Sequence, residues 1–508
     1  MASPKKRKKP TPKKPKAQPA ADAAAVVACW EDDPGDPDTQ PALIPINVPV
    51  PDPAAGSLPF KISGAAPAPK VYRPGTPEFL YYAAASALRR TSDFWAPILP
   101  KDTTWQIGKT LPVELDSGTD LNAFYTRGDG GDTPGLHFFH DNVDGRDYFS
   151  GESPDVVCHE MGHAVLDAIR PQLFDAQTIE AAAFHESMGD MSAMLSALQV
   201  PSFRQTVLND TGGFLNRSSR FSRLAEQLGA AIRVQHPDAV DGDCLRNAAN
   251  SFFYSDPQNL PPVAPASQLS SEPHAFSRVF TAAFLDALAG IFKLQSNSPG
   301  PDDLAQAALD LAKILVGGVL DAPVAPDYYS QVAAHMVDFG ENAPFSGKYR
   351  DVLKSSFVRR GILSLQAAAT LTAAAAGAAK KAKGFAAAAP AGTSRGPLPL
   401  AAISAANFGL KGPTLKVYTA EEPKRFGVTS SSLSLGAMQP RSAQVAAEAY
   451  TEDLFQRGHV DVGATSNRAV GLMHRFAFKT HTVVEKQGDL ILRRIAFDCG
   501  FDHRGREA

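Results

Sequence analysis

The sequence predicts an α+β protein in which a large mixed unit lies between a disordered N-terminal tail and a small C-terminal extension. Residues 1–72 are rich in Pro and Ala, 73–366 carry helix and strand patterns together, and 367–400 form an Ala-rich linker. Residues 401–508 recover the patterns of folded structure. At 508 residues the chain can bury a core several times larger than that of a minimal domain.

Local patterns predict the main elements in chain order. Residues 79–88 are typical of a helix, and 111–125 of a strand followed by a turn. The second half of the 73–366 unit is mainly helical in pattern. In the extension, 442–456 could form an amphipathic helix, and 475–501 alternates around a Gln-Gly-Asp turn, which predicts a β-hairpin. The predicted extension is therefore a helix plus a hairpin, of unknown function.

Charge and cysteine usage limit the possible partners and compartments. The formal net charge of −3 is too small to indicate a polyanionic partner for the whole chain. The basic run Lys5–Lys9 could contact polyanions such as nucleic acid or an anionic membrane, or nothing. No transmembrane segment or secretory signal is expected, and four scattered cysteines permit a reducing compartment. We expect a cytoplasmic protein, or one released without a signal peptide.

The most informative motif is HExxH, formed by His159, Glu160 and His163. On a helix, residues four apart share a face, so both imidazoles can reach one metal ion. Glu160 would lean toward the open side of that ion, where a general base is needed. The motif therefore predicts a zinc-dependent hydrolase.

A second helical stretch supplies carboxylates at a suitable spacing. Glu186 and Asp190 form an ExxxD pattern. A catalytic zinc site commonly has two His and one Glu as ligands, with the fourth position open, so Glu186 is the candidate third ligand. Asp190, one turn later, could accept the free ring N–H of a ligand His and fix its tautomer.

Several stretches in the same order resemble the thermolysin-like zinc metallopeptidases, a gluzincin family. Residues 120–125 are similar to the family's Asn-Ala-Phe-Trp edge strand, and 242–247 to its segment with a substrate-binding Arg. Residues 273–284 resemble the helix that begins with the catalytic His, and 328–363 the closing helices. The resemblance covers about residues 75–366. It implies a two-lobed catalytic domain with a mixed α/β N-lobe and a mainly helical C-lobe.

The resemblance also implies an activity and roles for individual residues. The expected activity is that of a zinc metalloendopeptidase, which acts on protein or peptide substrates before bulky apolar residues. His274 would stabilise the oxyanion. The residues expected to bind substrate are Asn122 and Ala123 on the edge strand, Arg246 at the substrate carbonyl, and Val156 and Leu245 in an apolar pocket.

Four departures from the family pattern bear on activity. Phe174 falls where the family has a Tyr that assists the oxyanion, and Leu269 falls where the Asp partner of the catalytic His should be, with Glu272 as the nearest carboxylate. Asp155 matches one ligand of the family's calcium site, but residues 191–201 contain no acidic side chain, so calcium is doubtful. About 70 residues precede the resemblance, too few for the family's inhibitory propeptide.

These departures keep a second hypothesis open. The chain could be a catalytically weakened peptide-binding or assembly protein on the same fold, in which the tail and the extension carry the function. Chelator-sensitive cleavage of a peptide would distinguish the two hypotheses.

Overall fold

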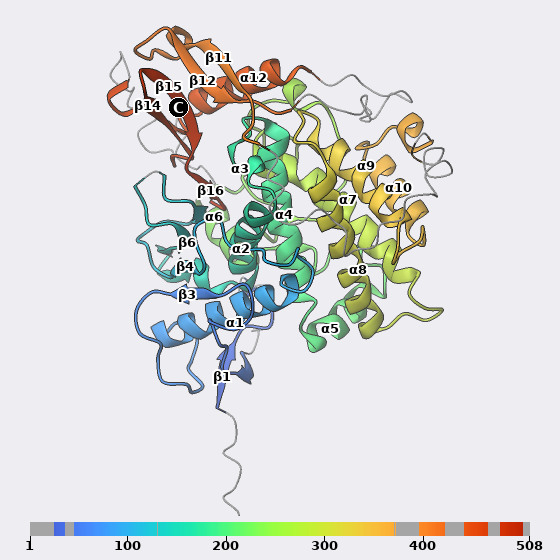
Figure 1. The fold of residues 1–508 in the computed structure, drawn as a ribbon. Helices are drawn as coiled ribbons and strands as arrows, with labels where there is room; N and C mark the ends of the chain where they lie inside the picture. The colour runs from blue at the N-terminus through green and yellow to red at the C-terminus, as the bar shows by residue number, and fades with distance from the viewer. Residues whose placement is uncertain are drawn as a thin grey trace, which may run out of the picture.

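The computed structural model describes residues 25–35, 45–129, 131–369, 371, 396–421, 441–465 and 478–500. The structure is α+β, as the sequence predicts. Helices fill one side of the molecule, strands gather on the other, and the C-terminal residues form a separate layer at one end (Figure 1). The basic run Lys5–Lys9 and most of the predicted linker lie outside the described residues.

A mixed five-stranded sheet forms the strand-rich side, with strand order β16-β5-β6-β4-β3. The strands β3 and β4 run parallel, as do β4 and β6, whereas β5 and β6 are antiparallel. Gly135 lets β6 approach β4 closely, since a Cβ there would lie 2.3 Å from the carbonyl oxygen of Pro112. The bounds are β3 Phe60–Ile62, β4 Leu111–Glu114, β5 Ala123–Thr126, β6 Gly135–Phe138 and β16 Ala496–Asp498.

Part of the N-terminal segment is folded, which differs from the predicted disorder of residues 1–72. The strands β1 (Val26–Cys29) and β2 (Ile46–Pro49) pair with each other, and β3 belongs to the main sheet. Phe60 and Ile62 are buried in the main core. Apolar side chains at the end of a Pro-rich stretch therefore contribute enough buried surface to order it.

Helices α1 (Pro77–Trp95), α2 (Pro154–Ile169) and α4 (Ile179–Ala197) connect the two sides. The predicted helix at 79–88 is confirmed and extends to Trp95, capped by Thr76. Shorter elements border them: the hairpin β7 (His140–Val143) and β8 (Arg146–Phe149), α3 (Gln172–Asp175), α5 (Pro201–Thr211), α6 (Glu226–Gln235), and the pair β9 (Arg223–Leu224) and β10 (Arg246–Asn247).

The helical side is formed by α7 (Pro273–Lys293), α8 (Pro301–Asp321), α9 (Tyr328–Glu341) and α10 (Arg350–Arg359). Among the described residues, α7 is the one helix long and apolar enough to cross a membrane, but 83% of its most apolar window is buried inside the protein. It contacts α4, α8 and α10. Its apolar character is therefore that of a core helix.

The C-terminal unit, defined as residues 396–421, 441–465 and 478–500, contains a second five-stranded sheet and one long helix. The predicted helix is α12 (Ala443–Gln456), and the predicted hairpin is β14 (His481–Lys486) with β15 (Asp489–Arg494). Gln487 and Gly488 turn the hairpin with positive φ angles. The other strands are β11 (Leu400–Ser404), β12 (Thr414–Tyr418) and β13 (Val460–Asp461).

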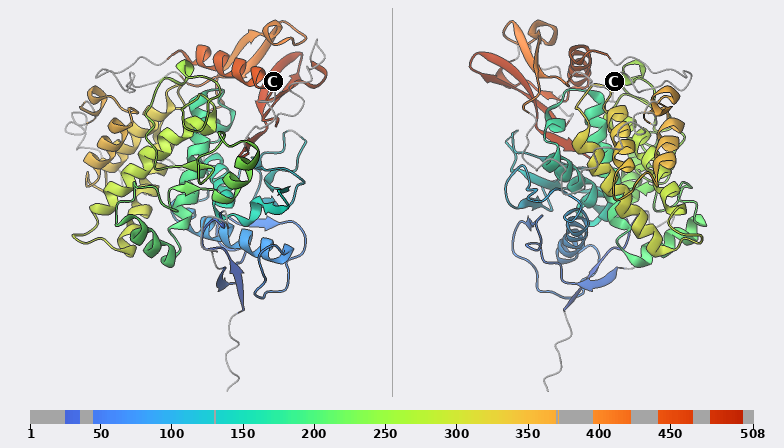
Figure 2. Two further views of the ribbon diagram at one scale, coloured as in Figure 1. Left: turned by 180° about the vertical axis from the view of Figure 1, so that it is seen from behind. Right: turned by 45° about the vertical axis from the view of Figure 1, so that its right-hand side comes forward.

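The C-terminal unit also completes the first sheet. Strand β16 leaves the unit and pairs antiparallel with β5 (Figures 1 and 2). The resemblance predicts that residues 120–125 form an edge strand, and this prediction is wrong for the described part of the chain. Strand β5 has β6 on one side and β16 on the other.

Candidate metal centre

Helix α2 begins at Pro154, with Ser153 as its cap, and carries the HExxH motif through the middle of the molecule. His159, Glu160 and His163 are all buried. Two glycines bring α4 close enough to add its side chains: a Cβ at Gly189 would lie 2.5 Å from the ring of His159, and one at Gly162 would lie 2.8 Å from Ser192 Cβ. Only this close approach of the two helices places Glu186 beside the histidines.

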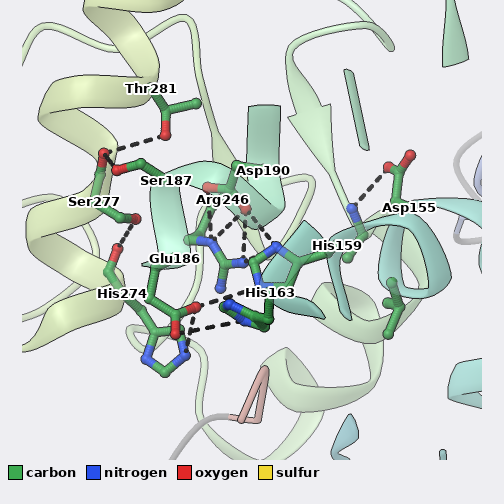
Figure 3. A network of polar contacts seen from close by, with 12 residues as sticks. Asp155, His159, His163, Glu186, Ser187, Asp190, Arg246, His274, Ser277 and Thr281 are labelled. Atoms are coloured by element: carbon green, nitrogen blue, oxygen red, sulfur yellow. Dashed lines mark hydrogen bonds and ion pairs between the residues drawn. The ribbon is translucent and has the colours of Figure 1, made fainter. Parts of the chain in front are cut away.

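The structure brings His159, His163 and Glu186 together (Figure 3). Nε2 of His159 lies 3.3 Å from Oε2 of Glu186, and Nε2 of His163 lies 3.8 Å from Oε1. Ligand atoms around a tetrahedral zinc with bonds of about 2.0–2.2 Å are separated by roughly 3.3–3.6 Å. The group therefore has the donor types and spacing to bind a metal.

The same three side chains leave buried polar atoms without a hydrogen-bond partner: Nε2 of both histidines and Oε2 of Glu186. Buried polar atoms are nearly always paired, because an unpaired one costs about 1–3 kcal/mol. A cation is the chemical group that would satisfy two imidazole nitrogens and a carboxylate at once. The residues present therefore fit a zinc ion.

Asp190 lies where the sequence predicts, against the other ring nitrogen of His159. Its Oδ1 is 3.0 Å from His159 Nδ1, and Arg246 donates to the same carboxylate at 2.8 Å. Burial alone would raise the pKa of Asp190, but Arg246 and His159 lower it to about 2. The ionised carboxylate can thus accept the Nδ1 proton and leave Nε2 as the metal-facing atom.

Glu160 is the least paired carboxylate of the site. Both of its side-chain oxygens are buried without a hydrogen-bond partner. Burial raises the pKa of Glu160 to about 8, with His159 acting in the opposite direction and Glu186 in the same one. Because no hydrogen bond within the described residues holds its oxygens, Glu160 can exchange a proton with a molecule bound beside it.

His274 lies beside the metal-binding group at the first turn of α7. Its Nδ1 is 2.6 Å from Oε1 of Glu272, and its Nε2 is 3.2 Å from Oε2 of Glu186 and 2.6 Å from the carbonyl oxygen of Asp498. Burial would lower its pKa, but Glu186 and Glu272 raise the pKa of His274 to about 10. The ring can therefore donate from both nitrogens.

The partner of His274 is Glu272, not a residue at the position of Leu269. Glu272 caps α7 by accepting the N–H of Ala275, and its other oxygen faces His274. Leu269 packs against the apolar core. An ungapped alignment with the family points to Leu269. It overlooks Glu272, whose carboxylate caps the helix and contacts the ring two residues further along the chain.

The substrate-binding predictions fall on two different cavities. A cavity of about 250 Å³ is lined by Leu245, Arg246, Glu186 and His274 on one side and by the C-terminal unit on the other. Val156 instead lines a separate small cavity with Leu121 and Tyr148. Among the described residues, Val156 and Leu245 therefore line different cavities.

Asn122 and Ala123 lie on the sheet side of the site, and both contact the C-terminal unit. Ala123 accepts the N–H of Cys499 at 2.8 Å, and Oδ1 of Asn122 accepts that of Gly500 at 2.7 Å. Phe174 is fully buried and packs against Tyr125 and Phe497. Phe174 has no hydroxyl group that could stabilise an oxyanion.

Asp155, at the first turn of α2, belongs to a separate cluster of buried carboxylates with Asp32, Asp33 and Glu226. Its Oδ2 accepts the N–H of Ala225 at 3.0 Å. Asp33 accepts N–H groups of Gly35 and Gln227 and the hydroxyl of Ser153. Burial raises the pKa of Asp32, Asp33 and Asp155. Hydrogen-bond donors within the protein thus already bind Asp33 and Asp155 of this cluster.

Sequence reasoning missed the residues that the C-terminal unit contributes to the site. Phe497, Asp498, Cys499 and Gly500 lie between β5 and His274. The alternation of residues 475–501 predicts a strand, but no local pattern tells where that strand docks. Comparison with protein-family models and with curated proteins gave no match. The chemistry of the site is therefore the main guide to function.

Proposed function

We propose that the protein is a zinc-dependent endopeptidase with the two-lobed arrangement of the thermolysin-like family. The observation that carries the proposal is the buried group of His159, His163 and Glu186, in which Nε2 of both histidines and Oε2 of Glu186 have no hydrogen-bond partner. Glu160 and His274 flank that group with a carboxylate and a doubly donating imidazole. Peptide hydrolysis needs both kinds of group beside a metal.

Each side chain then has a defined task. Zinc held by the three ligands would polarise the peptide carbonyl and lower the pKa of a water molecule toward 7. Glu160 takes the proton from the attacking water and delivers it to the leaving amine. His274 donates Nε2–H to the oxygen that becomes negatively charged, while Glu272 holds the ring in place. Asp190 fixes His159 in the tautomer that presents Nε2.

The substrate is an extended peptide that pairs with β5 on the side that β16 occupies in the structure. The carbonyl of Ala123 and the side chain of Asn122 accept its backbone N–H groups, and Arg246 faces the same cavity. Leu245 offers an apolar wall in that cavity. This supports cleavage of protein or peptide chains before a bulky apolar residue.

Phe174 favours the second candidate, a catalytically weakened peptide-binding protein. One missing oxyanion donor typically costs about 3 kcal/mol in the transition state, or roughly a hundredfold in rate. His274 still supplies a donor, so we expect a slow enzyme and not an inactive one.

The test uses the full chain loaded with zinc. Zinc per chain is measured together with cleavage of casein and of a blocked fluorogenic peptide, with and without a zinc chelator. Chelator-sensitive cleavage supports the endopeptidase. Glu186→Gln should lower the zinc content itself, and added zinc should partly restore the rate. A chain that binds one zinc but cleaves no peptide, even when Gly500→Ala displaces β16 from β5, would favour the peptide-binding alternative.

A further inference from the structure

The segment Ala496–Gly500 lies where the proposed substrate would lie. Strand β16 runs antiparallel to β5, with Phe497 opposite Tyr125 and Asp498 opposite Phe124. Beyond the strand, the N–H of Cys499 reaches the carbonyl of Ala123. A peptide that adds a strand to a sheet makes this pattern of main-chain hydrogen bonds.

The reacting groups also face this segment. Nε2 of His274 lies 2.6 Å from the carbonyl oxygen of Asp498. The thiol of Cys499 and ligand atoms of His159 and Glu160 all lie within 4.8 Å of one another. The donor that should stabilise a reacting carbonyl therefore lies at the carbonyl of Asp498. The carboxylate that should act as base lies near the side chain of the next residue, Cys499.

An aromatic side chain anchors the segment in a fitted pocket. The ring of Phe497 stacks on His185 at 4.0 Å and on His163 at 5.1 Å, and it meets the edge of Phe174 at 5.4 Å. Arg494, just before β16, lies 4.2 Å above the same ring and donates to the carbonyl of Phe174 at 3.1 Å. Side chains as well as main-chain hydrogen bonds thus hold the segment Ala496–Gly500 in place.

We propose, resting on the proposed endopeptidase activity, that Ala496–Gly500 occupies the peptide-binding cleft in the register of a substrate. The Asp498–Cys499 bond lies at the position of the bond to be cleaved, and the C-terminal unit is an internal inhibitor of the enzyme. Because inhibitor and cleft belong to one chain, the effective concentration of the inhibitor is high even if each contact is weak. Phe497 further identifies a subsite for an aromatic side chain on the amino-terminal side of the cleaved bond.

A single methyl group should displace the segment. A Cβ at Gly500 would lie 2.4 Å from Oδ1 of Asn122, the atom that Gly500 N–H contacts, so Gly500→Ala cannot keep the present fit. Gly396→Ala is the matched control in the C-terminal unit, because a Cβ there meets no atom within 4 Å. Both variants are made in the full chain, and their melting temperatures are compared with that of the wild type.

Two measurements detect displacement of the segment Ala496–Gly500, and one of them does not depend on catalysis. Gly500→Ala should raise kcat/KM for the fluorogenic peptide by about tenfold or more, since a steric clash and a lost hydrogen bond both weaken the occupant. Alkylation of Cys499, followed by mass spectrometry, should be slow in the wild type and fast in Gly500→Ala. The other cysteines, Cys29, Cys158 and Cys244, are buried elsewhere and serve as internal controls.

The outcomes separate this inference from the proposed function. Equal rates and equal labelling of Cys499 in wild type and Gly500→Ala would overturn the internal inhibitor and leave the endopeptidase standing. Faster labelling without any cleavage, in a chain that holds zinc, would support occupation of the cleft and contradict the endopeptidase. Gly396→Ala should match the wild type in both measurements.

A second variant covers the case in which Gly500→Ala does not fold. Phe497→Ser removes the anchor and leaves Asn122 untouched, so it should also raise the rate and expose Cys499. A synthetic peptide with the sequence of residues 494–500 should bind this variant and inhibit it, and should bind the wild type far more weakly. Equal binding of the peptide to both chains would contradict the proposal.

Discussion

Helix α2 carries buried polar side chains at two places, and the two groups differ in how they are satisfied. At its first turn, Asp155 and neighbouring Asp33 accept hydrogen bonds from backbone N–H groups and from Ser153. One turn later, Glu160 and the facing nitrogens of His159 and His163 have no such partners. Burial is nearly complete at both places, so burial alone does not distinguish them.

The difference lies in what would satisfy each group. The carboxylates at the first turn accept hydrogen bonds within the protein. These bonds connect the N-terminal segment and α2 to the start of α6. The HExxH group is unsatisfied by the protein itself, which is costly unless a ligand completes it. On helix α2, buried side-chain atoms without a hydrogen-bond partner thus lie at the HExxH group and not at Asp155.

The most direct test of this difference is to neutralise one carboxylate in each group. Glu160→Gln should keep zinc near one per chain and lower peptide cleavage by at least ~10²-fold, because the general base is lost. Asp155→Asn should leave the rate unchanged. Both are measured in a chain that also carries Gly500→Ala, so that the cleft is open. Loss of zinc in Glu160→Gln, or an equal loss of rate in both variants, would refute the assigned roles.

A second test separates the group that donates to the substrate from the group that positions it. His274→Ala should keep its metal and lose rate by roughly 10²–10³-fold, the scale of a lost oxyanion donor. Glu272→Gln should lower kcat by about tenfold with KM nearly unchanged, because the ring is still present but less well held. If Glu272→Gln changed only the melting temperature, Glu272 would be a helix cap and nothing more.

At the structural cluster we expect an effect on stability alone. Asp33→Ala leaves the N–H groups of Gly35 and Gln227 without their acceptor. The free energy of unfolding should fall by about 1–3 kcal/mol, and zinc content should stay constant. Denaturant unfolding and metal analysis check the two parts. A drop in zinc content would show that the two groups are coupled through α2.

The smallest expected effect concerns pH and calcium. Burial and the charges of Asp155, Glu226 and Asp33 raise the pKa of Asp32, against the opposing charge of Arg220. The folded state therefore binds this proton more tightly, and the stability so gained is lost as the pH rises through the folded pKa. Asp32→Asn should raise the melting temperature at pH 8 and change it little near pH 4.

The melting temperature also tests whether this carboxylate cluster binds calcium. With Asp33 and Asp155 already hydrogen-bonded by the chain, a calcium-selective chelator should leave the melting temperature unchanged. A fall with chelator, together with a fall in Asp32→Asn, would mean that these carboxylates bind a cation.

Sequence patterns predicted those parts of the site that depend on short spacings. His159, Glu160 and His163 share one helix, and Glu186 and Asp190 share the next long one, so helical periodicity was enough to group the residues within each helix. The α+β class and the C-terminal helix and hairpin follow from the same kind of local pattern.

Contacts between distant segments could not be predicted in this way. Asp33 reaches Gln227, and β16 pairs with β5, through packing that no local pattern encodes. The spacing of the family motif points to Leu269 as the partner of His274, whereas Glu272, the nearest carboxylate in the sequence, makes the contact from the N-cap of α7. Val156 and Leu245 line different cavities of the described residues, and no local pattern gives that separation.

The pairing of β16 with β5 also bears on how the chain folds. Thr126 at the end of β5 bonds the carbonyl of Ile495, 369 positions away. Contacts of such sequence separation form late, because a long loop must close before they give any stability. Until then β5 is an open edge with Phe124 and Tyr125 on it, ready to accept a strand from another molecule. During synthesis and refolding, the β5 edge is therefore a place where the protein is prone to aggregate.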